Sequence, residues 1–202
     1  AGAEVLEFQW DVVQRQDRSA GLVEPASMLA AHPLSQLPGV KSIEPFRTIP
    51  VRLHFGHRHR QLMIRGLPAV SHHDRVIDAD YHTIQLPPEG MVLSAKLAET
   101  LGARVGDGIL VEVLEGRRTT RAVPLTGLAE DFAGVGAYME RHALNRPPGE
   151  GDVMNAASFT VDSAHRAEFL RALKQTPRVN WVAVKEAMRA NFRATTAASI
   201  NT

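Results

Sequence analysis

The feature that most constrains the fold is a run of strictly alternating apolar and polar residues in the first third of the chain. The apolar members are Ile49, Val51, Leu53 and Phe55, and the residues between them are Pro50, Arg52 and His54. Successive side chains of a β-strand point to opposite faces, so this alternation predicts a strand with one buried face and one solvated face. Residues 56–58 form a hairpin turn, and Leu62 and Ile64 continue the alternation on a return strand.

Strands and helices alternate in the segments at the two ends of the chain. The expected strands cover residues 12–23, 40–46 and 179–184. One expected helix contains Leu34, and another follows a capping residue at Asp162 or Ser163. Two βαβ-like halves of this kind close into one split βαβ sheet with helices on one face. The predicted fold class is α+β.

The middle of the chain is richer in strands. After a turn at residues 86–90, a short strand leads into a helix that Ser94 caps and Gly102 ends. The further expected elements are a hairpin and one more helix, at residues 109–114 with 118–128 and at residues 137–145.

Two stretches rich in Pro, Gly and polar residues mark the expected domain boundaries. They predict a discontinuous outer subdomain of residues 1–67 and 152–202. The β-rich residues 68–151 would form a second subdomain inserted into it.

Composition excludes several functions. The 202 residues include no cysteine, which excludes disulfides, thiolate nucleophiles and cysteine metal sites. The formal net charge of +1 lacks the basic surplus of a nucleic-acid binder, so no nucleic-acid partner is expected. The sequence contains no P-loop, complete dinucleotide-binding glycine loop or Gly-x-Ser-x-Gly elbow, and we expect no cofactor. It also lacks the run of about 18 apolar residues that spans a bilayer.

Nine histidines raise an alternative from another class, a secreted or periplasmic metal-dependent hydrolase. Its ligands would be His54, His57 and His59, while His72 and His73 beside Asp74 form a second group. The arginines between the first three would repel a cation, and adjacent strand residues point in opposite directions. No His-Glu-x-x-His motif occurs, so we expect neither catalytic nor metal-ligating residues.

The hairpin is the most basic stretch of the chain and a candidate surface for an anionic partner. Charges of this kind also serve to prevent pairing between sheet edges. The expected contact residues for a partner or substrate are Arg52, His54, Arg58 and Arg60, with Tyr138 and Met139 as a second, apolar surface.

One segment carries a family resemblance. It runs Leu-Pro-Pro-Glu-Gly-Met-Val-Leu-Ser at residues 86–94, Leu-Ala-Glu-Thr-Leu-Gly at residues 97–102 and Val-Gly-Asp at residues 105–107. Similar motifs occur in the same order at residues 37–40, 43–47, 127–131 and 137–139. Together they resemble the extracytoplasmic, MacB-like periplasmic core domain of FtsX-like ABC transporter permeases, over nearly the whole chain.

The resemblance implies a porter-like split βαβ subdomain with an inserted β-rich, Sabre-like subdomain. It places the domain in the periplasm, between the first two transmembrane helices of a bacterial inner-membrane protein. A separate cytosolic ABC ATPase would hydrolyse ATP, and this domain would relay the motion without doing chemistry itself. A second permease copy, a periplasmic partner, and an apolar substrate such as a lipid or lipoprotein are the further implied partners.

The two ends of the chain fit this expectation. Neither a start methionine nor a signal peptide is visible, and a helical stripe from Met188 continues to Ile200 without a stop signal. We therefore expect flanking transmembrane helices, with Phe8 and Trp10 near Phe192 and Ile200 at one end of the fold. A β-barrel DNA-binding module centred on residues 91–128 is a third hypothesis, which the charge balance disfavours.

Overall fold

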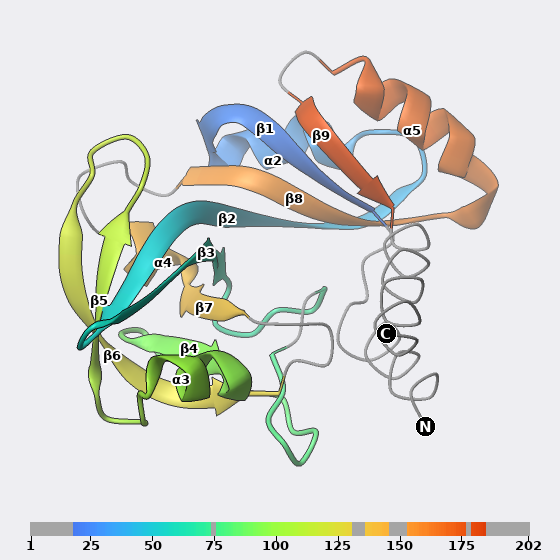
Figure 1. Ribbon diagram of the computed structural model, residues 1–202. Coiled ribbons are helices and arrows are strands. Elements are labelled where there is room, and N and C mark those ends of the chain that lie inside the picture. Colours follow the sequence, from blue (N-terminus) through green and yellow to red (C-terminus); the bar gives the residue numbers. More distant parts are fainter. Residues whose placement is uncertain (1–17, 74–75, 131–135, 146–152, 177–178, 185–202) are drawn as a thin grey trace, which may run out of the picture. The chain divides into compact units, whose positions relative to one another are not determined.

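The computed structural model describes residues 18–73, 76–130, 136–145, 153–176 and 179–184 (Figure 1). Residues 12–17 of the first expected strand and the helix expected from Met188 onward lie outside the described residues. So do Phe8, Trp10 and Phe192. Within the described ranges, no helix combines the length and the apolar character needed to cross a membrane.

Contacts between Cα atoms divide the chain into two compact units. Unit 1 comprises Ala1–Pro45, His72–Asp74 and Met154–Thr202, and unit 2 comprises Phe46–Ser71 and Arg75–Val153. In this division the first unit ends at residue 45, whereas the sequence analysis placed the end of the first outer segment at residue 67. The reason is that the basic hairpin pairs with strands of the inserted unit.

In the residues that the structure describes, unit 1 is a four-stranded sheet with two α-helices on one face. Its elements are β1 (Arg18–Ser27), η2 (Met28–Ala30), α2 (Ala31–Ser35), the first part of β2 (Val40–Phe55), β8 (Val153–Val161), η3 (Ser163–His165), α5 (Arg166–Lys174) and β9 (Val179–Val184). The strand order is β2-β8-β1-β9, with β1 and β9 antiparallel. Because β8 lies between β1 and β2, the expected split βαβ arrangement is confirmed.

The core of unit 1 joins both helices to the sheet. Leu34 of α2 and Phe169 of α5 belong to one buried cluster with Phe159 of β8, so both helices cover the same sheet face. The turn into β2 requires glycine, because Gly39 has a φ of +77° and a Cβ there would lie 2.4 Å from the His165 Cβ.

Unit 2 is a closed six-stranded β-barrel. Its elements are the second part of β2, β3 (Arg58–Leu67), β4 (Met91–Ser94), α3 (Ala95–Leu101), β5 (Gly108–Val113), β6 (Thr120–Ala129), β7 (Ala137–Glu140) and α4 (Arg141–Asn145). Neighbouring strands pair in the ring β2-β3-β7-β4-β6-β5 and back to β2. The pairs β3–β7 and β4–β6 are parallel. Closure leaves none of these strands as a free edge.

The barrel interior is apolar. Val51, Leu53, Ile64, Leu93 and Ile109 point inward and are fully buried. The predicted helix α3 begins where Ser94 Oγ accepts a hydrogen bond from Leu97 N and ends at Gly102, whose φ is 76°. Both boundary residues act as the sequence pattern indicated.

The helix expected at residues 137–145 was wrong in its first half. Ala137–Glu140 forms strand β7, which pairs with β3 and β4, and only Arg141–Asn145 is helical. Four residues are too few for a period of two to stand out in the sequence. The two pairings that close the barrel therefore decide the conformation of this segment.

Candidate contact surface

The β2–β3 hairpin presents its charged residues on two different faces. In the antiparallel register, Arg52 lies opposite Gln61 and His54 lies opposite His59. Leu53 lies opposite Arg60, and Phe55 lies opposite Arg58. Residues directly opposite each other share a face, so Arg52 and His54 lie on the outer surface of the barrel. Arg58 and Arg60 lie on the face of the core residues Leu53 and Phe55, toward one end of the barrel.

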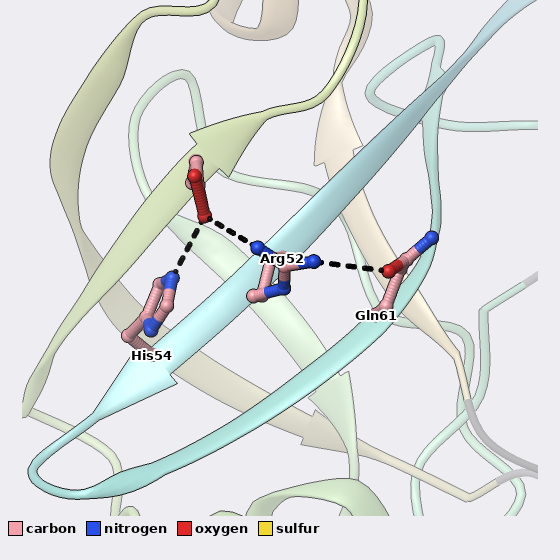
Figure 2. Close-up of polar contacts among 4 residues, drawn as sticks. Arg52, His54 and Gln61 are labelled. Carbon is pink, nitrogen blue, oxygen red and sulfur yellow. Dashed lines mark hydrogen bonds and ion pairs between the residues drawn. The ribbon is translucent and has the colours of Figure 1, made fainter.

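Glu112 of β5 joins the two outer residues. Its Oε1 atom lies 3.3 Å from Arg52 Nη1 and 3.0 Å from His54 Nε2, and Arg52 Nη2 donates to Gln61 Oε1 over 3.3 Å (Figure 2). The ring centroids of His54 and His59 are 5.8 Å apart. These contacts hold Arg52 and His54 in a fixed network on the barrel surface.

This network lowers the pKa of Glu112 below its ordinary value of 4.5, chiefly through the hydrogen bond from His54 and secondarily through the charge of Arg52. Because the pKa is lower in the folded chain, the stabilisation is present above the ordinary pKa and is lost as pH falls through the folded-state pKa.

We expect His54→Ala to return the Glu112 pKa toward 4.5, with a smaller rise for Arg52→Ala. Carbon-13 NMR of the Glu112 carboxyl carbon measures both. If the Glu112 pKa is the same in the His54→Ala variant and in the unchanged chain, His54 is not the chief cause of the lowered pKa. Arg58→Ala is the control, because Arg58 does not contact Glu112.

The two arginines on the other face bind main-chain carbonyls. Arg58 Nη1 donates to Thr100 O at the end of α3 over 3.3 Å, and Arg60 Nη1 donates to His59 O over 2.7 Å. Arg58 lies beside Gly102, where a Cβ would be 3.4 Å from its Nη1 atom. The four predicted contact residues therefore form two separate groups on the barrel, because the hairpin register separates them.

The second predicted surface needs correction. Met139 belongs to the barrel core with 2% of its surface exposed, whereas its neighbour Tyr138 is half-buried. Alternation along β7 points Met139 inward. Only Tyr138 of this pair can contribute to a contact.

The three hairpin histidines do not form a cluster of metal-ligand geometry. In the part of the chain that the structure describes, the group with that geometry is Asp78, Asp80 and His82. Asp78 Oδ1 already accepts hydrogen bonds from the main-chain nitrogens of Asp80 and His82. This arrangement is that of a polar turn.

Of the barrel strands, the segment considered as a DNA-binding module, residues 91–128, contains β4, β5 and nearly all of β6. The barrel closes through β2, β3 and β7 as well. The segment is thus half of a larger barrel and not a module of its own.

Sequence reasoning missed one polar cluster. His73 is 5% exposed and contacts Ser42 and Ser158, which are more than thirty and eighty residues away in the sequence. Single serines on strands give no signal in a sequence. The pair His72 and His73 was noted only as metal ligands, a role that the hydroxyl contacts of His73 do not support.

No family model matches the sequence, and no curated protein matches it. The structure is similar to the periplasmic region of MacB from Actinobacillus actinomycetemcomitans, with a TM-score of 0.54, 10% identity, and coverage of 94% of this chain and 98% of that chain. It is also similar to the extracellular domain of the ABC-type transporter YknZ from Gram-positive bacteria, with a TM-score of 0.51, 15% identity, and coverage of 84% and 98%. The expected fold is confirmed.

Proposed function

We propose that this chain is the extracytoplasmic domain of an ABC transporter permease. The observation that carries the proposal is the similarity to the MacB periplasmic region, which extends over 98% of that chain and includes both units. The interrupted order of the units supports it, since unit 1 is built from segments before and after unit 2. The first and last described strands, β1 and β9, both belong to unit 1, and flanking transmembrane helices would connect to a single unit in this way.

In this proposal the domain transmits motion and does no chemistry. A separate cytosolic ABC ATPase drives the membrane part of the permease. The two units, each with its own core, move as bodies in a hinge or shear transition. The motion serves export or extraction of a lipid, lipoprotein or other apolar substrate, or acts on a periplasmic partner.

Arg58 and Arg60 are the part of the basic hairpin best suited to contact that partner or substrate. Arg58 and Arg60 donate hydrogen bonds to main-chain carbonyls, whereas Arg52 and His54 already share the carboxylate of Glu112. A guanidinium bound to one carbonyl keeps further N–H donors for an incoming acceptor. Tyr138 remains the candidate apolar contact.

The test uses the full-length gene product in its native membrane. We expect the product to fractionate with the membrane, to be cleaved within this domain by protease added outside spheroplasts, and to copurify with an ATPase subunit. A product released from the cells without membrane treatment overturns the proposal.

The double variant R58E/R60E tests the contact residues, with R117E/R118E in the β5–β6 turn as a control of equal charge change. If the two double variants of the full-length protein transport equally well, Arg58 and Arg60 are not contact residues.

A further inference from the structure

One face of the unit 1 sheet carries a polar surface. Ser42 and Glu44 of β2 are two residues apart on one side of their strand, and Ser158 and Thr160 of β8 are likewise two residues apart. Phe159 and Val161, which alternate with them, belong to the apolar core beneath the helices. The polar surface is therefore the face opposite the helices.

The imidazole of His73 binds this surface through both ring nitrogens. Its Nε2 atom lies 2.8 Å from Ser42 Oγ, and its Nδ1 atom lies 2.8 Å from Ser158 Oγ. Ser158 is 3% exposed and donates its hydroxyl proton to Glu44 O over 3.4 Å, so its oxygen accepts from Nδ1–H. Nε2 then accepts from Ser42, whose oxygen lies 2.6 Å from Thr160 Oγ1. One imidazole thus bridges β2 and β8.

The neighbouring residue adds a main-chain contact. His72 N donates to Glu44 Oε1 over 2.9 Å, while the His72 side chain is exposed. The segment His72–Asp74 belongs to unit 1, but the residues on both sides of it, Phe46–Ser71 and Arg75–Val153, belong to unit 2. The side chain of His73 and the main chain of His72 thus both bind this short return of the chain to unit 1.

We propose that His73 is a pin, a side chain that fixes His72 and His73 onto the sheet of unit 1. With the segment bound, the chain passes between the units after residues 45, 71, 74 and 153. With the segment released, only the first and last passages remain. The pin therefore sets how many chain connections link the two units, and its release is a conformational step in its own right. This inference does not depend on the proposed transporter role.

The test is hydrogen–deuterium exchange of the 202-residue chain, read by mass spectrometry in peptides that contain residues 71–73. His73→Ala removes both ring contacts, and we expect exchange there to become roughly 10- to 100-fold faster. Ser158→Ala leaves the Nδ1–H of His73 without its buried acceptor, and we expect roughly a tenfold increase in the exchange rate of the same peptides. Ser42 is exposed, so in Ser42→Ala a water molecule replaces the lost hydroxyl. We therefore expect a smaller increase in exchange rate for Ser42→Ala than for Ser158→Ala. His72→Ala is the matched control, because it keeps the hydrogen bond from the main-chain nitrogen of residue 72 to Glu44 and both ring contacts of His73.

Each outcome of the exchange experiment either supports or overturns the role of His73. Faster exchange confined to these peptides in His73→Ala, with His72→Ala unchanged, supports the pin. Unchanged exchange in His73→Ala overturns it. If His73→Ala unfolds unit 1 as a whole, the milder Ser158→Ala variant decides: a local increase supports the pin, and unchanged exchange overturns it.

Discussion

Replacing Phe169 with alanine is expected to destabilise unit 1 by about 3–5 kcal/mol while leaving the barrel of unit 2 intact. Phe169 of α5 is fully buried, and its ring packs edge-to-face on Phe159 with the centroids 5.1 Å apart. The substitution removes this aromatic contact and leaves a cavity between the helix and the sheet. Urea denaturation followed by exchange in peptides from β8 and α5 measures the loss.

Specificity for unit 1 follows from the separation of the two cores. The cluster that contains Phe169 shares no residue with the cluster inside the barrel. Exchange in β5 and β6 should therefore not change in the Phe169→Ala variant. An equal increase in both units would show that they unfold as one. Glu168→Ala, an exposed change on the same helix, is the control and should stay within about 0.5 kcal/mol of the unchanged chain.

Leu53→Ala is the corresponding experiment for unit 2, with an expected cost of about 2–5 kcal/mol. Leu53 is fully buried on β2 and pairs with Val111 of β5 on one side and Arg60 of β3 on the other. Its loss creates a cavity at the point where the hairpin joins the barrel. Urea denaturation read by exchange in β3 and β5 measures the effect.

A matched control lies on the adjacent strand. Leu110 of β5 pairs with His54 on the outer face and is 43% exposed, so Leu110→Ala deletes the same atoms without opening an internal cavity. Its effect should be well below half that of Leu53→Ala. Similar losses at both positions would contradict the inward orientation of Leu53 and hence the closed barrel.

The hairpin shows how far sequence patterns reach in this protein. Alternation correctly placed Arg52 and His54 on the face opposite Val51, Leu53 and Phe55. Grouping Arg58 and Arg60 with them rested on charge alone. The strand register assigns these two arginines to the other face, and register depends on the turn and on pairing with β5.

Segment β7 shows where the patterns fail. Ala137, Tyr138, Met139 and Glu140 have no strong local preference for a strand, and the residues after them are helical. Their conformation is fixed by hydrogen bonds to β3 and β4, which lie more than forty residues earlier. Met139 was therefore predicted on a surface although it lies in the core.

The sequence by itself determined the elements whose signals are local: the β2–β3 alternation, the Ser94 cap and Gly102 end of α3, and the outer segments that build the split βαβ sheet. Periodicity and capping need only neighbouring residues, so the sequence contains them in full. Only the tertiary structure decided the closure of the barrel, the division of contacts at residue 45 and the bonding of His73 to Ser42 and Ser158. Each of these depends on contacts between distant segments, and such contacts form only when both partners have already been positioned by the rest of the fold.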